Sequence, residues 1–200
     1  MKIIGITGGV GSGKSRVLSY METKYRAVIC QADQVAWKLQ EPGTKCYREI
    51  VGHYGEEILN DDQTIDRKKL GQIVFADEKE LKILNQIMHP AVKEQIKKLI
   101  QIEKEKGTTL FLLEAALLLE EKYDEICDEL WFVYANEAVR RMRLKESRNY
   151  SDEKISAIIE TQLSEKYFQE HCQIMIDNSG EFEDTCIQIE NAMKDLGVTI

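Results

Sequence analysis

The feature that most constrains this chain is a glycine-rich stretch near its start, GGVGSGKS at residues 8–15, which matches the pattern G-x-x-x-x-G-K-[S/T]. An apolar run, KIIGIT, precedes it, and apolar residues at helical spacing follow it. Gly8, Gly11 and Gly13 allow a loop whose backbone N–H groups turn inward, toward an anion at the positive end of the next helix. The stretch therefore predicts a strand, a phosphate-binding loop and a helix, but it names no phosphate acceptor.

Two side chains at the end of this loop carry the chemistry. Lys14 has the length and charge to reach the β- and γ-phosphates of a nucleotide, and Ser15 supplies a hydroxyl for Mg²⁺. The competing interpretation is a glycine-rich turn that binds nothing. It leaves a lysine and a serine at these offsets without a purpose, so we expect a nucleoside triphosphate and Mg²⁺ as cofactors.

Apolar runs without strict alternation predict the rest of the sheet, since strands covered on both faces are apolar throughout. The five runs span residues 2–7, 27–30, 109–114, 129–134 and 173–176. Segments with helical character separate them. The pattern predicts an α/β fold of the P-loop NTPase type, with three layers and a five-stranded parallel sheet.

One gap between strands, from about residue 31 to 108, is far longer than a crossover helix needs. Its segments TKCYREIVGHYGEEIL and PAVKEQIKKLIQIEKEK look helical, and Asp77 with Glu80 resembles a capping box. We therefore expect a single domain over residues 1–200 that carries a helical insertion. The insertion, at about residues 33–108, is large enough to form an acceptor-binding lobe.

A second helical segment covers residues 136–162 and holds four arginines within nine residues. A charge run is usually a solvated helix face. In an acidic chain, however, guanidinium groups also suit the charge that develops on a phosphoryl group in transfer. We favour a lid at about residues 136–165, with Arg143 and Arg148 as its functional residues. Farther along, Ser179 is expected to cap a last helix that runs to about Leu196, and residues 117–120, LLLE, to form a core-facing helix.

Three other side chains are candidate site residues, each with a structural alternative. Asp33 follows the second strand and can accept a proton from an attacking hydroxyl, or merely cap the next helix. Glu114 ends a buried strand, where it can bind a Mg²⁺ ion or simply mark the solvent edge. His89 precedes Pro90 at an expected helix start and is a candidate substrate ligand, although a lone histidine is more often structural.

Composition and missing motifs narrow the class of protein. A net charge of −8 argues against a general nucleic-acid binder, and five cysteines without a C-x-x-C pair indicate reduced thiols rather than a zinc site. We find no signal peptide and no apolar stretch long enough to span a bilayer, so we expect a cytoplasmic protein without membrane association. An N-K-x-D segment typical of GTPases is absent, as is a strand that ends in Asp-Glu. Small-molecule kinases are the class that remains.

Taken together, the motifs resemble the dephospho-CoA kinase family over nearly the whole chain. They occur in order as GITGGVGSGKS, Ala32-Asp33, EPGTKCYREIV, TIDRKKLGQIVFAD, MHPAV, SDEKISAIIETQLSE and MIDNSG. The resemblance implies transfer of a phosphoryl group from ATP to the ribose 3′-hydroxyl of dephospho-CoA, which gives coenzyme A and ADP. It implies a nucleoside-monophosphate-kinase-like fold and small-molecule partners, and it leaves open a monomer or a small homo-oligomer.

The resemblance also implies roles for individual residues. ATP phosphates would lie against Gly11, Ser12, Gly13, Lys14, Ser15 and Arg16. Asp33 would be the catalytic base, and Arg143 and Arg148 would be lid arginines. Gln162 and Asn178 would lie in motifs near the nucleotide, Gln162 as a substrate ligand and Asn178 as a ligand of ATP. The chain departs from the family at Glu114 and Ala116, where Asp and Pro are commoner, and at Arg16, where a small residue is usual. A nucleoside or nucleotide kinase and a nucleotide-binding regulatory module stay as alternatives.

Overall fold

The computed structural model describes residues 1–198, and these divide into two compact units. The sheet unit consists of Met1–Cys30 together with Glu103–Ile200, of which the last two residues are not described. The helical unit is Gln31–Ile102. The insertion expected at about residues 33–108 thus corresponds to a separate unit, while its assignment as an acceptor lobe stays a prediction.

Five strands form the sheet, in the order β2-β3-β1-β4-β5. They are β1 (Lys2–Thr7), β2 (Val28–Gln31), β3 (Leu110–Glu114), β4 (Glu129–Tyr134) and β5 (Ile174–Asp177). The β1–β3, β1–β4 and β4–β5 pairs are parallel. The predicted α/β class with a five-stranded parallel sheet is confirmed. The second, third and fifth strands begin one residue later than the apolar runs indicated.

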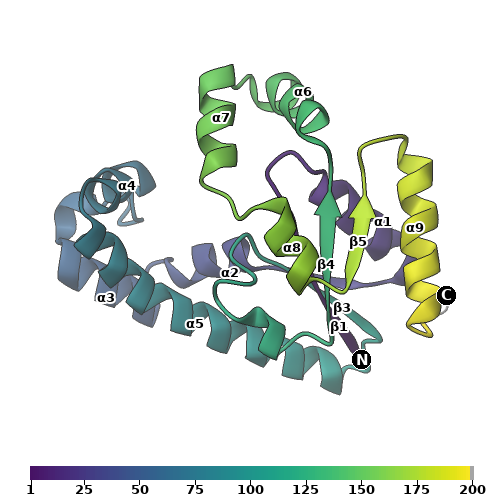
Figure 1. Ribbon diagram of the computed structural model, residues 1–200. Coiled ribbons are helices and arrows are strands. Elements are labelled where there is room, and N and C mark those ends of the chain that lie inside the picture. The colour runs from purple at the N-terminus through teal and green to yellow at the C-terminus, as the bar shows by residue number, and fades with distance from the viewer. Residues whose placement is uncertain (199–200) are drawn as a thin grey trace. The chain divides into compact units, whose positions relative to one another are not determined.

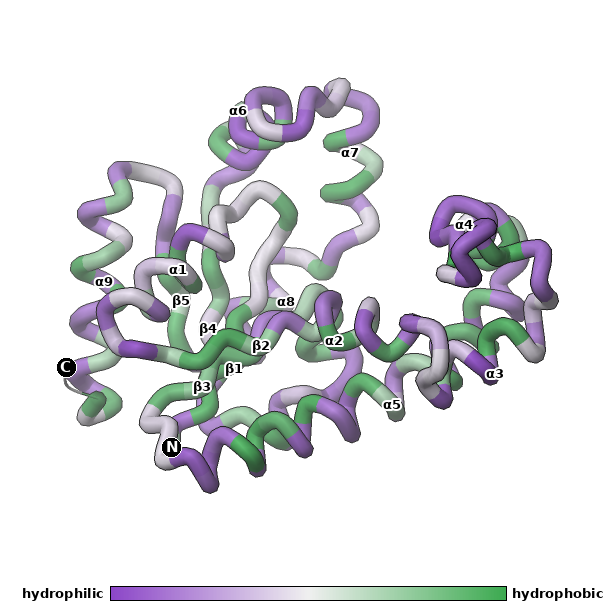
Figure 2. The backbone as a smooth tube through the Cα atoms, turned by 180° about the vertical axis from the view of Figure 1, so that it is seen from behind, coloured by the Kyte–Doolittle hydropathy of each residue, from purple (hydrophilic) through white to green (hydrophobic). Residues whose placement is uncertain are grey.

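Helices cover both faces of this sheet. The helices of the sheet unit are α1 (Lys14–Tyr25), α6 (Glu137–Arg148), α7 (Asp152–Glu160), α8 (Glu165–His171) and α9 (Phe182–Asp195), with a short helix η2 at Tyr123–Glu125. Apolar residues of α1 and α9 pack with β1, β3, β4 and β5 into one buried cluster. On the other face, the ring of Phe168 in α8 stacks on Phe132 in β4 with a centroid distance of 4.8 Å. Figures 1 and 2 show this layering and the hydrophobic residues along β1, β3 and β4.

The helical unit contains α2 (Ala32–Leu39), α3 (Lys45–Tyr54), the short helix η1 (Glu56–Ile58), α4 (Arg67–Ala76) and α5 (Glu78–Glu105), whose last three residues belong to the sheet unit. Side-chain caps start two of its helices: Thr44 accepts a hydrogen bond from Tyr47 N, and Asp66 accepts from the first amides of α4. Ile50, Ile58 and Ile96 are fully buried in the core.

Several local predictions about helix starts were wrong. The second strand runs directly into α2, so the cap position is Gln31 and Asp33 lies inside the first turn. His89 and Pro90 lie in the middle of α5, because the helix begins at Glu78 and continues through the proline. Asp77 does bind the α5 amide of Lys79, but Glu80 contacts His53 instead of completing a capping box.

Three further segments differ in detail from the predictions. The 136–162 segment is helical as predicted, but it forms two helices, since Asn149 adopts the left-handed conformation at the end of α6. Residues 116–122 form turns rather than a helix, with Leu118 fully buried. Ser179 does not cap α9, which begins at Phe182 after Glu181. Its hydroxyl instead accepts a hydrogen bond from Asn136 N at the start of α6.

Candidate active site

The phosphate-binding loop connects β1 to α1 in a conformation that only glycine accommodates. Gly13 has a φ of +90°, and a Cβ atom there would lie 2.2 Å from Nδ2 of Asn178. At Gly8, a Cβ atom would lie 2.4 Å from the carbonyl oxygen of Val133. The glycines of the motif are thus required by close packing of the loop against β4 and against the residue that follows β5, as well as by its backbone dihedrals.

The start of α1 offers backbone donors to an anion. Gly13 occupies the N-cap position and provides no side-chain cap, so the helix start is not covered by a side-chain acceptor. The first N–H groups of a helix have no partner within the helix, and the helix dipole favours negative charge there. The ammonium group of Lys14 reaches back across the loop to the Gly8 carbonyl oxygen, at 2.6 Å. It therefore lies where a phosphate chain in the loop would meet it.

Side chains from distant parts of the sheet unit hold the outside of this loop. Arg140 Nε donates to the carbonyl of Val10 at 2.9 Å, and its Nη2 donates to Gln162 Oε1 at 2.6 Å. The same Oε1 atom accepts a hydrogen bond from Val10 N at 3.3 Å. These bonds fix the backbone at Val10, because both its N–H and its carbonyl oxygen are hydrogen-bonded to side chains.

The carbonyl oxygen of Ser12 has two donors on the same outer side. Asn178 Nδ2 lies 2.7 Å from it, and Arg143 Nη1 lies 3.3 Å from it. Arg143 Nη2 also donates to the Asn178 carbonyl oxygen at 2.9 Å, which ties the two residues together. Because outer groups bind the loop carbonyls, the loop is organised before any phosphate arrives.

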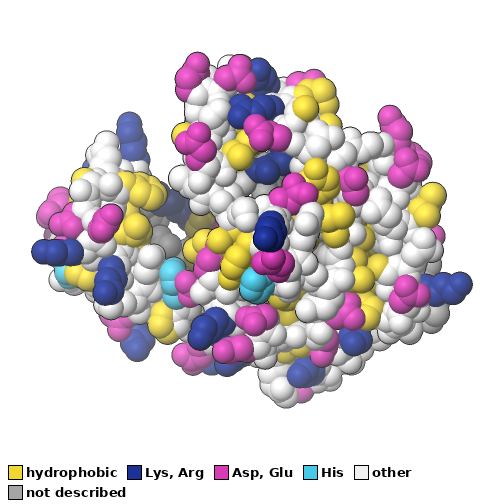
Figure 3. Space-filling view, viewed as in Figure 1, with side chains coloured by type: hydrophobic (Ala, Val, Ile, Leu, Met, Phe, Trp, Pro, Cys, Tyr) yellow, Lys and Arg dark blue, Asp and Glu magenta, His cyan; other side chains and the backbone are white. Residues whose placement is uncertain are grey.

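The electrostatics of the loop favour an anion. Burial lowers the pKa of the Arg140 guanidinium, and both burial and the nearby charge of Arg16 lower the pKa of Arg143. A lowered pKa means that these cations lack full compensation by water or carboxylates, and a bound phosphate would supply it. Figure 3 shows cationic and acidic side chains side by side over the surface of α6 and α7. Arg140 and Arg143, by contrast, are only partly exposed.

A cavity of about 330 Å³ borders the loop at Gly9 and Ser12. Side chains from β4, α6, α7, α8 and the 162–164 turn line it, among them Arg140 and Gln162. The Ser12 hydroxyl is buried and has no hydrogen-bond partner among residues 1–198. A buried hydroxyl without a partner is costly, so an oxygen-rich ligand such as a phosphate would satisfy a group that the protein leaves unpaired.

The two candidate Mg²⁺ ligands lie in the sheet unit. Ser15 is exposed in the first turn of α1. Glu114 ends β3 and pairs in register with Ile6 of β1, at the edge of the sheet from which the loop departs. Hydroxyl and carboxylate oxygens are the hard donors that Mg²⁺ prefers, and this ion takes its remaining ligands from phosphates and water. This donor set fits Mg²⁺.

The remaining predicted residues lie in varied places. Asp33 is exposed in the first turn of α2, where the helix dipole is favourable to a carboxylate. His89 lines a shallow cavity along α5. The guanidinium of Arg148 is exposed, 5.9 Å from the ring centroid of Tyr150. The guanidinium of Arg16 lies 3.8 Å from the ring centroid of Phe182, so its side chain packs on α9.

Sequence reasoning missed Arg140 as a site residue, although it counted this residue in the arginine cluster. Residues three apart on a helix share a face, so Arg140 and Arg143 project together from α6. Arg148 is five positions beyond Arg143 and projects from another face. Helical spacing could therefore have indicated Arg140, whereas its hydrogen bond to Val10 joins residues 130 positions apart and carries no local signal.

Comparison with known proteins gives a consistent result. The family model for dephospho-CoA kinase matches residues 2–184. The chain is 37% identical to the dephospho-CoA kinase of Shouchella clausii over 190 residues, which cover 95% of this chain and 96% of that relative. Among solved structures, TT1252 from Thermus thermophilus has a TM-score of 0.81 at 25% identity, with 98% of this chain and 97% of that chain covered. The dephospho-CoA kinase from Campylobacter jejuni has a TM-score of 0.74 at 22% identity, with 98% of each chain covered.

Within residues 1–198, no helix has the length and apolar character needed to cross a membrane.

Proposed function

The chain belongs to the dephospho-CoA kinase family, and we propose that it transfers the γ-phosphoryl group of ATP to the ribose 3′-hydroxyl of dephospho-CoA, which yields coenzyme A and ADP. The observation that carries the proposal is the preformed phosphate-binding loop, whose carbonyls are held by Arg140, Arg143 and Asn178. A family match over residues 2–184 supports this acceptor over a nucleoside, and it supports turnover over a purely regulatory role.

The donor side of the reaction lies in the sheet unit. The amides at the start of α1 would bind the β- and γ-phosphate oxygens, and Lys14 would exchange its contact with the Gly8 carbonyl for the phosphates. Ser15 and Glu114 would hold Mg²⁺, which neutralises charge on the phosphate chain when it is bound. The neighbouring contacts of Gln162 and Asn178 with the loop would keep its amides in position.

Asp33 is the proposed general base. Its carboxylate is solvent-accessible at the start of α2, so it can accept the proton of the 3′-hydroxyl as that oxygen attacks the γ-phosphorus. The bond from phosphorus to the bridging oxygen of ADP then breaks, and ADP leaves. The helical unit would bind the acceptor, and we include His89 there as a proposed substrate ligand.

Arginines would compensate the charge that spreads over the transferring group. Arg143 already donates to the loop backbone, and Arg148 would reach the phosphates only by movement of the proposed lid formed by α6 and α7. Arg16 stays a proposed phosphate-binding residue, although its N–H already donates to the Gly13 carbonyl oxygen at 3.0 Å. The two lid arginines therefore differ in the expected effect of their removal.

The deciding experiment is a product assay. Purified protein with ATP, Mg²⁺ and dephospho-CoA should form CoA and ADP, identified by mass spectrometry. Nucleosides, nucleoside monophosphates and shikimate serve as alternative acceptors in parallel reactions. No CoA at saturating substrate, together with good turnover of another acceptor, would refute the proposed substrate. Binding of ATP without turnover of any acceptor would favour a regulatory module.

Matched variants separate the roles of the residues. Asp33→Asn should retain ATP binding and lose most of kcat, because the proton acceptor is removed while the shape is kept, and the exposed Asp61→Asn serves as its control. Lys14→Ala should raise the KM for ATP and lower kcat, whereas Lys166→Ala on the surface of α8 should change neither. Near-wild-type turnover of Asp33→Asn would remove Asp33 from the mechanism.

The same comparison applies to the arginines. Arg143→Ala should lower kcat and also raise the KM for ATP, because it loses both a cation and a support of the loop. Arg148→Ala should lower kcat alone. If neither variant lowers kcat, the arginine run is a solvated face. A cytoplasmic location, the absence of nucleic-acid binding and a monomer or small homo-oligomer stay predictions.

A further inference from the structure

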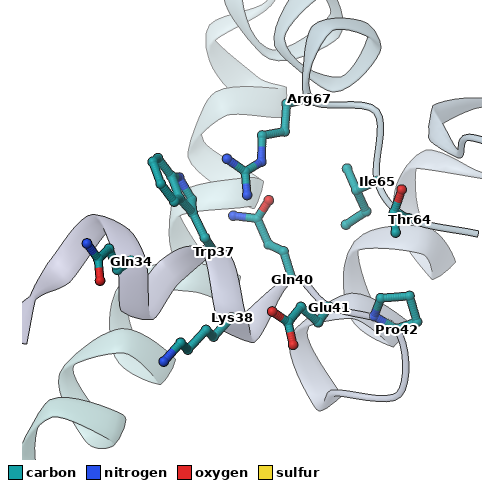
Figure 4. Close-up of a pocket in the computed structure, with 9 residues that line it drawn as sticks. All are labelled: Gln34, Trp37, Lys38, Gln40, Glu41, Pro42, Thr64, Ile65 and Arg67. Carbon is teal, nitrogen blue, oxygen red and sulfur yellow. The ribbon is translucent and has the colours of Figure 1, made fainter.

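The helical unit contains a pocket that none of the roles above uses. It is a cavity of about 410 Å³ lined by residues from the end of α2, from the turn that follows, and from the segment that leads into α4. Figure 4 shows Trp37 and Arg67 on one side of this cavity, Ile65 and Pro42 on the other, and the amide of Gln40 between them. The volume lies in the usual range for a small-molecule site.

The Trp37 side of the pocket is built for contact with a flat group. The Trp37 residue is 49% exposed, although indole is among the largest apolar side chains. The guanidinium of Arg67 lies 4.6 Å from its ring centroid. This pair presents planar π and cationic surfaces to the cavity, which are the surfaces that stack on nucleobases. Burial of this exposed indole by a ligand would also remove apolar surface from water.

The pocket is less suited to a phosphate group. The N-terminus of α4 begins at Arg67, but the Asp66 carboxylate already accepts hydrogen bonds from Lys68 N at 2.9 Å and Lys69 N at 3.1 Å. The amides that would bind an anion are therefore taken. The cavity lining carries charges of both signs, because the carboxylate of Glu41 lies in it beside the cations of Lys38 and Arg67. A neutral, flat ring with hydrogen-bonding edges fits these surroundings better than a diphosphate does.

The pocket lies next to the proposed catalytic base along one helix. Asp33 and Trp37 are both in α2, four residues apart, so they lie on the same helix face and about 6 Å apart along the axis. The proposed acceptor hydroxyl belongs to a ribose that also carries adenine. A base that binds against Trp37 would therefore leave its own ribose within reach of Asp33.

We propose that Trp37 and Arg67 form the stacking site for the adenine ring of dephospho-CoA, with the Gln40 amide at the edge of the ring and Ile65 and Pro42 on its far side. This inference rests on the proposed function, because it names the part of that acceptor which the pocket binds. ATP carries the same base. The position of the pocket on the helix of Asp33 assigns it to the adenine of the acceptor.

Fluorescence provides a direct test because the chain has two tryptophans, Trp37 and the fully buried Trp131. Quenching by acrylamide therefore reports mainly on Trp37. Saturating dephospho-CoA should reduce this quenching by at least half, while phosphopantetheine alone and ATP with Mg²⁺ should leave it unchanged. Equal protection by phosphopantetheine, equal protection by ATP, or no protection by dephospho-CoA would each overturn the proposal.

Kinetics of matched variants give the second test. Trp37→Ala should raise the KM for dephospho-CoA about tenfold or more and leave the KM for ATP within twofold, since base stacking is lost only on the acceptor side. Trp37→Phe should retain most of the affinity. The control is Phe75→Ala, which removes an 83% exposed aromatic ring of the same unit outside the pocket. An unchanged KM for dephospho-CoA in Trp37→Ala would refute the stacking site while CoA formation stands, whereas no CoA from the unmodified protein would refute the proposed function itself.

Discussion

The carbonyl oxygen of Ser12 offers a quantitative test of how the phosphate-binding loop is held. It accepts hydrogen bonds from Asn178 Nδ2 and from Arg143 Nη1, and both Ser12 and Asn178 are buried. Asn178→Ala or Arg143→Ala each leaves this oxygen with one donor. The double variant leaves it with none, so the two substitutions should not be additive.

The expected magnitudes follow from the contacts. A net hydrogen bond contributes about 1 kcal/mol, so each single variant should lower the free energy of unfolding by about 1–2 kcal/mol. A buried acceptor without any donor costs a further 1–3 kcal/mol or so. The hydrogen bond from Arg143 is the longer of the two, at 3.3 Å. We therefore place the coupling energy between the two substitutions near the lower end of this range of about 1–3 kcal/mol. We therefore expect the double variant to lose about 1 kcal/mol more than the sum of the single variants.

Urea unfolding monitored by Trp131 fluorescence measures this cycle, in a Trp37→Phe background so that the buried tryptophan of the sheet unit is the sole reporter. A control cycle pairs Asn178→Ala with Lys166→Ala on the exposed surface of α8, and these changes should add within about 0.5 kcal/mol. Strict additivity of Asn178→Ala and Arg143→Ala would refute the reasoning, because it would mean that the Ser12 carbonyl does not depend on these two donors.

Three further outcomes are expected. Gly9→Ala places a Cβ atom 2.5 Å from the Arg140 guanidinium, so it should displace that group and raise the KM for ATP several-fold. Initial rates measured over a range of ATP concentrations test this, and an unchanged KM would mean that the arginine moves without cost. Burial raises the pKa of Cys127 to about 12 and of Cys172 to about 11 from the ordinary 9.0. Alkylation of both thiols at pH 8 should therefore be markedly slower in the native protein than in urea, and equal rates would contradict the raised pKa values. Hydrogen bonds from α1 side chains lower the pKa of Glu190, which contributes stability that is present above the ordinary pKa of 4.5 and is lost as the pH falls. Glu190→Gln should therefore destabilise the protein at pH 6, with a difference in urea midpoint that shrinks below pH 4.5; a difference that is constant with pH would contradict the ionic contribution.

The architecture of the sheet unit could largely be predicted from the sequence. The run at residues 2–7, the glycines of the loop and the helix that begins at Lys14 are contiguous, so their pattern alone indicates a strand, an anion-binding turn and a helix. Helix starts were harder to predict. Asp33 has the residue type of a cap, but β2 continues straight into α2 and leaves no loop for a cap, so the backbone rather than the side chain decides its place.

The candidate site divides in the same way. Lys14 and Ser15 could be assigned from their offsets within one motif, because the motif is itself the binding structure. The sequence could not show which arginines contact that motif, since Arg140 and Arg143 come from a helix that the fold brings to the loop. The spacing of the arginines along α6 gives part of the answer. It places Arg140 and Arg143 on one face of the helix and Arg148 on another.

By itself, the sequence determined the class of fold, the phosphate-binding loop and the kind of donor, because each depends on residues close together in the chain. Tertiary structure alone decided how the loop is held. The bond that Asn178 donates to Ser12 and the bond that Val10 donates to Gln162 join residues 166 and 152 positions apart. Hydrogen bonds of this kind depend on which chain segments the packed sheet brings together, and local patterns of residue type do not encode that choice.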